Sequence, residues 1–419
     1  MDERSRAVEE VVRRCRFCRT ALRVVFADLG MTPLANSYLA PDELEKMEPF
    51  YPLCAYVCEE CFLVQLEEFE SPQAIFGDYA YFSSYSTSWL EHARTFAEAA
   101  AERLRLGKES LVVEIASNDG YLLRWFQQLS IPVLGIEPAR NVAEAAIANG
   151  IPTHIEFFGV DAARKLAERG ETADLVVGNN VLAHVPDLQD FIGGLALAVK
   201  PQGRISVEFP HLLNLIEQCQ YDTIYHEHFS YLSLGTVQRM FAAHGLTVVH
   251  VEELTTHGGS LRVWAAPAPS SPPVAGSVAA QLRRERAAGL DRLETYERFD
   301  AAVVESKRTL LEFLIAQKRE GRSIAAYGAP AKGNTLLNYC GIRNDFIDYT
   351  VDRSPHKQGR FLPGTHIPIY PVERVAETKP DYLLILPWNL RDEIVEQMVF
   401  VRDWGCRFVT PIPRVSVHS

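Results

Sequence analysis

The sequence lacks long apolar runs and is short of positive charge. No apolar stretch approaches the roughly 20 residues that a membrane-spanning helix needs, and the first residues, MDERSRAVEEVVRRCRF, carry charges throughout. We therefore expect no signal peptide, no membrane partner and a cytoplasmic location. Lys and Arg number 42 against 54 Asp and Glu, and the net charge of -12 repels phosphate backbones, so nucleic acid is not an expected partner. The expected oligomeric state is a monomer.

Cysteine is also scarce, with eight residues in 419. Four of them form two pairs separated by 39 residues, Cys15-x-x-Cys18 and Cys58-x-x-Cys61. This is the spacing of a zinc ribbon, in which each tight turn supplies two of four thiolates, and it suits a reducing compartment better than disulfides do. Four protein ligands leave no open position, so the zinc would be structural. Unmetallated buried cysteines are the alternative, and Cys54 is expected to pack rather than to bind metal.

The length of 419 residues favours two or three domains. Residues 1–70 hold the cysteine pairs and strand-like pieces at 51–57 and 63–66, which indicates a zinc-ribbon-like domain. Residues 71–265 alternate helical patterns with apolar strand-like runs, which are 110–116, 133–137, 173–179 and 203–208. This alternation predicts a Rossmann-like domain, that is, a parallel sheet covered by helices.

Residues 266–419 form the third predicted unit. A proline-rich linker spans 265–277, and one or two amphipathic helices follow at 278–318. The alternation then returns, with strands expected at 323–327, 346–351 and 382–386. The predicted fold class is therefore α/β, with a zinc-ribbon-like domain followed by two Rossmann-like domains.

A nucleoside site is indicated in the central domain. A buried strand at 111–116 leads into a small-residue turn ending at Gly120, which lets backbone N–H groups approach a ligand. Glu137 follows 17 residues later at the end of the next strand, where its carboxylate can bind both ribose hydroxyls. These features also fit a dinucleotide. Together with DLVVGNNVLAHV at 174–185, they resemble class I methyltransferases, which bind S-adenosylmethionine.

That resemblance implies a set of cofactor contacts. The methionine and ribose side would be lined by Glu114, Ala116, Asn118 and Gly120, with Glu137 on the ribose and the backbone of Asn179 also on the cofactor. Phe157 and Phe158 either flank the adenine ring or belong to the core.

The most unusual segment is YDTIYHEHFSY at 221–231, where histidines and acids stand beside tyrosines and neither Gly nor Pro borders them. Packing explains this segment, the string at 221–231, poorly. A His-x-His metal site would need further ligands nearby, which the sequence does not supply. A catalytic role is favoured. His226 is left out of it, because in an extended strand it would face away from Glu227.

Several motifs in the same order carry a resemblance to a known family. They are the cysteine quartet, DYAYFSSYSTSWL at 78–90, YHEH at 225–228, HGGSLRV at 257–263 and GAPAKGN at 328–334. Over nearly its whole length the chain resembles the sugar C-methyltransferases that act at C-3 of dTDP-linked 4-keto deoxysugars in antibiotic pathways. The resemblance implies S-adenosylmethionine as methyl donor and a dTDP-keto sugar as substrate. The carbon beside the ketone would lose a proton before methyl transfer.

The resemblance also assigns roles to the string. His228 would be the base, since an imidazole with a pKa of about 6.5 suits that task near neutral pH. Glu227 would orient or tune His228, and Tyr225 and Tyr79 would donate hydrogen bonds near the keto oxygen. His184 would lie beside the cofactor or the substrate, with a core or capping histidine as the alternative.

The segment AYGAPAKGNT at 326–335 follows a strand and opens a helix, so its turn amides and Lys332 form a candidate diphosphate cradle. It lacks the spacing of nucleotide hydrolases, which argues against ATP. The resemblance suggests that this domain holds the dTDP part, with Lys332, Asn334 and Tyr327 as contacts. Weaker candidates are Asp352, Arg360, Asn389, His257 and Ser260.

The predicted function is methylation at C-3 of a dTDP-linked keto sugar. One alternative is N- or O-methylation, which needs a base but no stabiliser of an enolate. The other is a noncatalytic zinc-ribbon adaptor, which would not bind S-adenosylmethionine. Glu137 and the YHEH motif argue against the adaptor.

Overall fold

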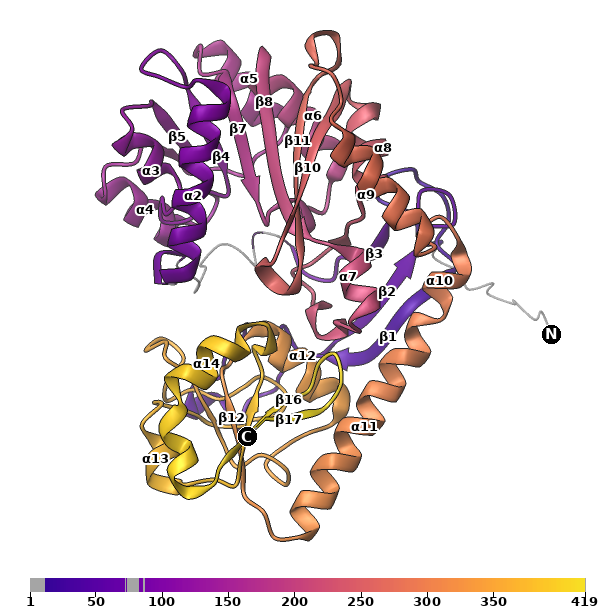
Figure 1. Cartoon of the computed structure of the whole chain (residues 1–419), viewed down its shortest axis with the longest axis vertical. Coiled ribbons are helices and arrows are strands. Elements are labelled where there is room, and N and C mark those ends of the chain that lie inside the picture. Colours follow the sequence, from indigo (N-terminus) through magenta and orange to yellow (C-terminus); the bar gives the residue numbers. More distant parts are fainter. Residues whose placement is uncertain (1–11, 72, 74–82, 86, 419) are drawn as a thin grey trace, which may run out of the picture.

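Three β-sheets organise the described part of the chain, which is residues 12–71, 73, 83–85 and 87–418 of this computed structural model. A four-stranded sheet contains the N-terminal strands, a seven-stranded sheet the middle of the chain, and a six-stranded sheet the C-terminal part. In Figure 1 the seven-stranded sheet forms the upper part of the molecule and the six-stranded sheet the lower part, with β1 and β2 beside them. The α/β fold class is confirmed.

The four-stranded sheet has the order β1-β2-β3-β9 and is antiparallel. Its strands are β1 (Val24–Thr32), β2 (Tyr51–Val57), β3 (Val64–Leu66) and β9 (Ser230–Tyr231). The last of these strands comes from the string at 221–231, and Tyr231 pairs with Val64. The N-terminal unit and the string therefore share one sheet.

The seven-stranded sheet has the order β10-β11-β8-β7-β4-β5-β6, and β11 runs antiparallel to both of its neighbours. The strands are β4 (Val112–Ile115), β5 (Val133–Ile136), β6 (Thr153–His154), β7 (Ala173–Asn179), β8 (Val199–Pro210), β10 (Leu246–Leu254) and β11 (Ser260–Pro267). The parallel strands β4 and β5 are buried at every residue, because helices cover both faces of such a sheet.

The helices around this sheet are α2 (Thr87–Leu104), α3 (Leu123–Gln128), α4 (Arg140–Ala148), α5 (Val160–Glu168), α6 (Leu188–Ala198), α7 (Leu212–Glu217), α8 (Leu234–Ala243) and α9 (Gly276–Ala287). Side-chain caps start two of them, since Asp187 accepts from the amides at the start of α6 and Ser233 does so for α8. The segment expected to be a linker at 265–277 has no strand or α-helix at 268–275, but its ends belong to regular elements: β11 extends through Pro267, and α9 begins at Gly276 and packs on β10 and α8. Domain boundaries near residues 70 and 265 remain predictions.

The C-terminal sheet has the order β14-β13-β12-β15-β16-β17, with only β17 antiparallel to its neighbour among the described strands. Its strands are β12 (Ile324–Tyr327), β13 (Thr350–Val351), β14 (Ile369–Tyr370), β15 (Tyr382–Ile385), β16 (Arg407–Thr410) and β17 (Ser416–His418). The accompanying helices are α10 (Leu293–Glu297), α11 (Phe299–Arg319), α12 (Ala331–Cys340), α13 (Arg374–Thr378) and α14 (Arg391–Gln397). The strand expected at 346–351 is formed only at its end.

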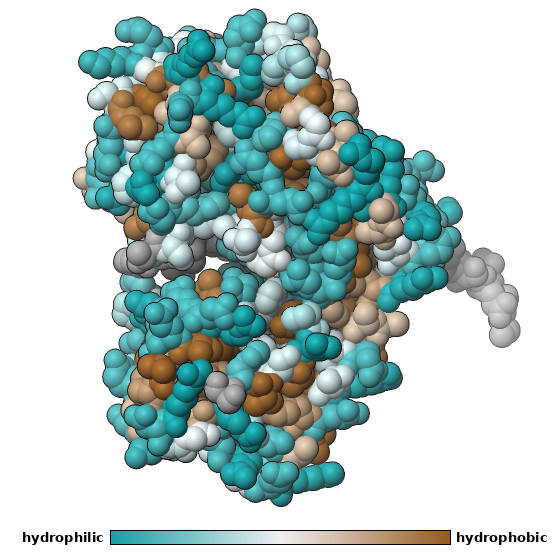
Figure 2. Space-filling model, in the orientation of Figure 1, coloured by the Kyte–Doolittle hydropathy of each residue, from teal (hydrophilic) through white to brown (hydrophobic). Residues whose placement is uncertain are grey.

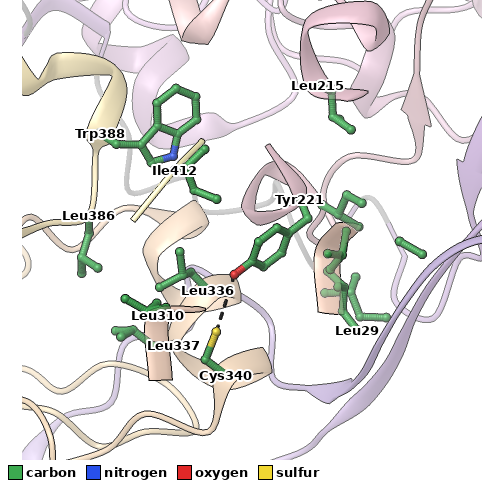
Figure 3. Close-up of a cluster of buried hydrophobic side chains, with 14 of the residues drawn as sticks. Leu29, Leu215, Tyr221, Leu310, Leu336, Leu337, Cys340, Leu386, Trp388 and Ile412 are labelled. Atoms are coloured by element: carbon green, nitrogen blue, oxygen red, sulfur yellow. Dashed lines mark hydrogen bonds between the residues drawn. The ribbon is translucent and has the colours of Figure 1, made fainter. Parts of the chain in front are cut away.

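A shared core joins the string to the C-terminal unit. Tyr221 is fully buried, and its ring points from a 3-10 turn, η4 (Tyr221–Thr223), toward the leucines of α12 (Figure 3). Its hydroxyl lies 3.5 Å from the Cys340 sulfur. Next to it in sequence, Asp222 accepts a 2.7 Å hydrogen bond from the Trp388 indole. Packing and hydrogen bonds therefore fix the start of the string on the C-terminal unit.

None of the helices within the described ranges is long and apolar enough to cross a membrane.

The N-terminal sheet and α11 should depend on one aromatic contact. The Phe26 ring of β1 stacks on Phe299 at 4.4 Å, and both side chains are buried. We expect Phe299→Ala to lower the free energy of unfolding by about 3–5 kcal/mol, because it leaves a cavity between the two elements. Urea titration followed by tryptophan fluorescence measures this. Ile315→Ala, on an exposed position of the same helix, is the control and should cost less than about 1 kcal/mol; equal losses would contradict the assignment.

Candidate active site

The carboxyl ends of β4, β5 and β7 meet at one edge of the seven-stranded sheet, where ligands bind in such folds. Polar side-chain atoms at this edge are buried without a hydrogen-bond partner among the described residues. They belong to Glu114, Ser117, Asp119, Asn179 and Asn180. Each unpaired buried polar group costs about 1–3 kcal/mol. The cluster therefore fits a polar ligand such as the amino acid and ribose of S-adenosylmethionine.

The turn after β4 uses backbone conformations that glycine usually adopts. Ala116 and Asn118 have φ values of 55° and 51°, and Gly120 has 79°. A Cβ atom on Gly120 would lie 2.8 Å from Ile151 Cγ1, so glycine is required there. Left-handed conformations at other residues cost about 1–3 kcal/mol and occur where ligands bind. The turn thus forms although two of its usual glycines are missing.

Glu137 is held at the end of β5 by two backbone amides. Its oxygens accept hydrogen bonds from the N–H groups of Asn118 and Ala139, each at 2.8 Å. Burial raises the pKa of Glu137, and these two bonds lower it. Each oxygen keeps a lone pair that can accept from a ribose hydroxyl.

Two aromatic candidates at this end of the sheet differ in environment. Phe158 is half-buried and packs edge-on against Phe191 at 5.4 Å, whereas Phe157 is 42% exposed. Phe158 therefore packs against the core through Phe191, whereas Phe157 is exposed. Tyr79, the other aromatic candidate, lies outside the described residues.

The string is not one extended strand. It begins as η4, passes through a turn at 226–227 and ends in β9. His226 donates to the Pro52 carbonyl at 3.1 Å and packs against Tyr51, so it faces the N-terminal sheet. His226 and Glu227 therefore have different partners, as expected, but because of a turn and not because of the alternation of an extended strand.

His228 has one defined tautomer. Its Nδ1 lies 2.9 Å from the Thr223 carbonyl, which can only accept, so Nδ1 carries the proton. The other ring nitrogen, Nε2, is then a lone-pair acceptor for the Tyr225 hydroxyl at 2.8 Å. Burial is the largest cause that holds the pKa of His228 well below its usual value, and repulsion from His184, when that ring is protonated, acts in the same direction. The imidazole is thus neutral at neutral pH, which is the form that a base needs.

His184 lies beside this imidazole. It belongs to a 3-10 turn after β7, η3 (Leu182–His184), and its ring centre is 4.7 Å from that of His228. Its Nδ1 donates to the Glu227 carbonyl at 2.7 Å. Burial lowers the pKa of His184 to about 4, so this second imidazole is neutral as well.

Glu227 contacts a residue that the sequence did not suggest. Its carboxylate accepts from the Asn36 side-chain amide at 2.8 and 2.9 Å, while both ring nitrogens of His228 are bonded elsewhere. Orientation of the His228 ring by Glu227 was one expected role. Glu227 does not make the hydrogen bond to His228 that this role would use. Burial raises the pKa of Glu227 to about 7, and the hydrogen bond from Asn36 lowers it.

The predicted substrate residues divide into two kinds. Lys332 donates to Asn389 at 2.8 Å, lies 4.8 Å from the Trp388 ring centre, and is close enough to His228 to lower its pKa. Asn334 instead donates to the Ala35 carbonyl, and the Tyr327 hydroxyl donates to Gln397. Lys332 thus faces the string, whereas the polar groups of the other two serve protein contacts. Figure 2 shows the surface hollowed between the upper and lower parts of the molecule.

The four cysteines come together in the N-terminal unit. Their sulfur atoms all lie within 4.8 Å of one another, with Cys15 and Cys61 at 3.6 Å and Cys18 and Cys58 at 3.4 Å. Four sulfurs at about 2.3 Å from a tetrahedral zinc would be about 3.8 Å apart. The site therefore fits zinc, held by four protein ligands. Fold and sites together define an S-adenosylmethionine-dependent methyltransferase with a zinc-binding unit.

Comparisons with known proteins identify the family. Residues 15–76 match a zinc-binding domain family, residues 89–251 a methyltransferase domain and residues 255–413 a C-methyltransferase C-terminal domain. The chain is 37% identical over 98% of its length to C-methyltransferase NovU of Streptomyces niveus, of which it covers 99%. The chain therefore belongs to this family of zinc-binding C-methyltransferases.

Other similarities are local. A ubiquinone biosynthesis O-methyltransferase of Rhizobium etli is 34% identical over 100 residues, which are 23% of this chain and 39% of that protein. The magnesium protoporphyrin IX methyltransferase of Synechocystis, solved with bound S-adenosylmethionine, is 15% identical, with a TM-score of 0.33 over 46% of this chain and 88% of that one. The family assignment depends on the full-length match and not on these.

Three site residues were not found from the sequence. Asn36 contacts Glu227, Trp388 lies against Lys332, and Asp222 accepts from the Trp388 indole. Asp222 stands inside the string and could have been chosen on that ground. Asn36 and Trp388 lie in segments without a motif, so no sequence signal marked them.

Zinc should be bound and needed for the fold of the N-terminal unit. We expect the purified protein to contain one zinc per chain by mass spectrometry of metals, and Cys58→Ser to lose it and to unfold at a lower temperature, because metal binding contributes to folding. Cys219→Ser, which removes a thiol outside the cluster, is the control and should retain the metal. A Cys58→Ser protein with full zinc content would show that the ligand set is different.

Proposed function

We propose that this enzyme methylates a carbon atom next to the ketone of a dTDP-linked deoxysugar. The observation that carries the proposal is the state of His228: a neutral imidazole whose Nδ1 is bonded to a carbonyl and whose Nε2 has its lone pair on the Tyr225 hydroxyl. A base with a fixed tautomer and a phenol at its reactive nitrogen suits removal of a proton from carbon beside a carbonyl.

The proposed steps involve these two side chains. On substrate binding, the Tyr225 hydroxyl turns its hydrogen bond to the keto oxygen and frees Nε2 of His228. The C–H bond breaks, its proton goes to Nε2, and its electron pair moves into the enolate, whose oxygen Tyr225 stabilises. S-adenosylmethionine, held by the turn after β4 and by Glu137, would supply the electrophilic methyl group, its methyl–sulfur bond breaking as the new carbon–carbon bond forms and S-adenosylhomocysteine leaving. His228 finally returns its proton to solvent.

The other string residues support this arrangement. His184 would hold the substrate or the methyl-donor end, Glu227 would act on His228 through its charge, and Tyr79 would donate a second hydrogen bond near the keto oxygen. His184 lies 4.7 Å from His228 between ring centres, which supports a place in the same site.

The substrate class follows from the C-terminal unit and the family. Lys332 carries a charge into the space that His228 faces, and turn amides at the start of α12 lie beside it, which supports binding of a nucleotide diphosphate. A ketone at C-4 acidifies both C-3 and C-5, and we propose C-3. Free thiolates at the zinc site suit a reducing compartment, and we propose a cytoplasmic monomer.

The reaction can be tested with methyl-labelled S-adenosylmethionine and a panel of dTDP-4-keto deoxysugars. NMR should find the label on carbon at C-3, and the C-3 hydrogen should exchange with deuterated water. His228→Asn should lower turnover by about 10²- to 10⁴-fold and abolish exchange, with cofactor binding intact. His250→Asn, on β10, is the control. Label on oxygen or nitrogen would refute C-methylation, and label at C-5 would move the site to the other side of the ketone.

Lys332 should bind the substrate and not the cofactor. We expect Lys332→Ala to raise the dissociation constant of the dTDP-sugar by about ten- to a hundredfold, because it removes a charge-assisted contact, and to leave S-adenosylmethionine binding unchanged. Isothermal titration calorimetry measures both. Lys318→Ala, on α11, removes a charge of the same sign outside the site and should change neither constant. Equal weakening of both ligands would contradict this division.

A further inference from the structure

The N-terminal unit reaches the string through the loop at 33–39. The Asn36 side-chain nitrogen donates to both oxygens of Glu227, at 2.8 and 2.9 Å. Glu227 is 5% exposed, and among the described residues Asn36 is the one hydrogen-bond donor to its carboxylate. An acid in the middle of the string is thus bonded by a residue of the zinc-binding unit.

This loop is fixed from its other side by the C-terminal unit. Asn334 donates to the Ala35 carbonyl, and the Tyr38 hydroxyl donates to the Ala329 carbonyl at 2.5 Å. The Tyr38 hydroxyl also lies 3.3 Å from the Asn36 side-chain oxygen, and the Glu227 carboxylate, which can only accept, takes the amide nitrogen. Asn36 is therefore held between two units and does not depend on its own loop for its position.

We infer that Asn36 is a positioning residue of the active site, which keeps Glu227, the residue before His228 in the chain, in its carboxylate form when this imidazole takes up a proton. The inference rests on the proposed function, in which His228 becomes an imidazolium. A carboxylate near an imidazolium favours the charged ring, whereas a neutral acid does not. The zinc-binding unit then contributes directly to catalysis through a single amide.

Among the described groups around Glu227, Asn36 is the one that stabilises its carboxylate form. Burial raises the pKa of Glu227 to about 7, and the bond from Asn36 opposes that rise. Among the described residues, Tyr38 from the loop is the titratable side chain whose pKa responds to the charge of Glu227, and His184 from η3 donates to the Glu227 backbone carbonyl. Burial favours the neutral form of Tyr38, His184 and His228, so none of these three offsets the negative charge. Lys357 lies beyond Tyr38, 5.2 Å from its ring centre.

The sign of the pH effect follows. Below its pKa Glu227 is neutral, so activity that needs the carboxylate falls as pH decreases through about 7. Loss of the Asn36 bond leaves burial unopposed and moves this acid limb to higher pH. A purely structural role of Asn36 would instead lower activity by the same factor at every pH.

The test compares pH profiles of kcat/KM for the full-length enzyme, Asn36→Ala, Asn36→Asp and Glu227→Gln. We expect the acid limb of Asn36→Ala to move up by about one pH unit, which is about a tenfold loss at pH 6 with recovery at pH 9. Asn36→Asp should move it further, because a second carboxylate disfavours ionisation of the first. In the Glu227→Gln background, Asn36→Ala should have no additional effect on the limb. Asn338→Ala, which removes an amide bonded within the C-terminal unit, is the control and should leave the limb in place.

A second measurement does not require turnover. The infrared carbonyl band of protonated Glu227, identified by difference from Glu227→Gln, should titrate at higher pH in Asn36→Ala. If Asn36→Ala fails to fold, Asn36→Ser keeps a small donor and should show the same shift in smaller degree. An unmoved band, or equal loss of activity at all pH values, would overturn the inference. Absence of methyl transfer to any keto sugar, with the band shifted, would refute the proposed function alone.

Discussion

The structure depends on one constraint: the string at 221–231 is fixed at both ends by units that are distant in sequence. At its start, Tyr221 is buried among the α12 leucines of the C-terminal unit, and Asp222 accepts from the Trp388 indole. At its end, Ser230 and Tyr231 pair with β3 of the N-terminal sheet. The segment between them, which contains His228, has therefore little freedom, and the Thr223 carbonyl sets the tautomer of this histidine.

Anchoring of this kind places ionisable groups where water is scarce. Burial lowers the pKa of His184 to about 4 and raises those of Glu227 and Asp222 to about 7 and 6. Each unit of such a shift represents about 1.4 kcal/mol between the two protonation states. Groups arranged only for stability would not be left in this condition, since apolar residues would fill the same volume at less cost. Shifts of this size cluster at functional sites, and they support the proposed proton transfer.

Much of the fold could be predicted, because it is written in local patterns. β2 and β7 have the expected bounds, the cysteine pairs meet as their spacing implies, and the four strands expected in the central domain lie in one sheet and pair in parallel, whereas β6, β10 and β11 of that sheet were not expected. The conformation of the string could not be predicted, because no Gly or Pro marks its turn and because tertiary contacts impose its shape. Asn36 is a similar case: its partner Glu227 is 191 residues away, and its own loop carries no motif.

The zinc site is far from the chemistry in sequence but connected to it by contacts. Gln65 of β3 donates to the Cys15 sulfur at 3.3 Å, accepts from the Arg16 amide, and pairs across the sheet with Ser230. Zinc at the cysteines would fix the loop that carries Cys15, and hence the side chain of Gln65 and the edge to which the string is paired. A closed metal site can in this way matter for catalysis without an open ligand position.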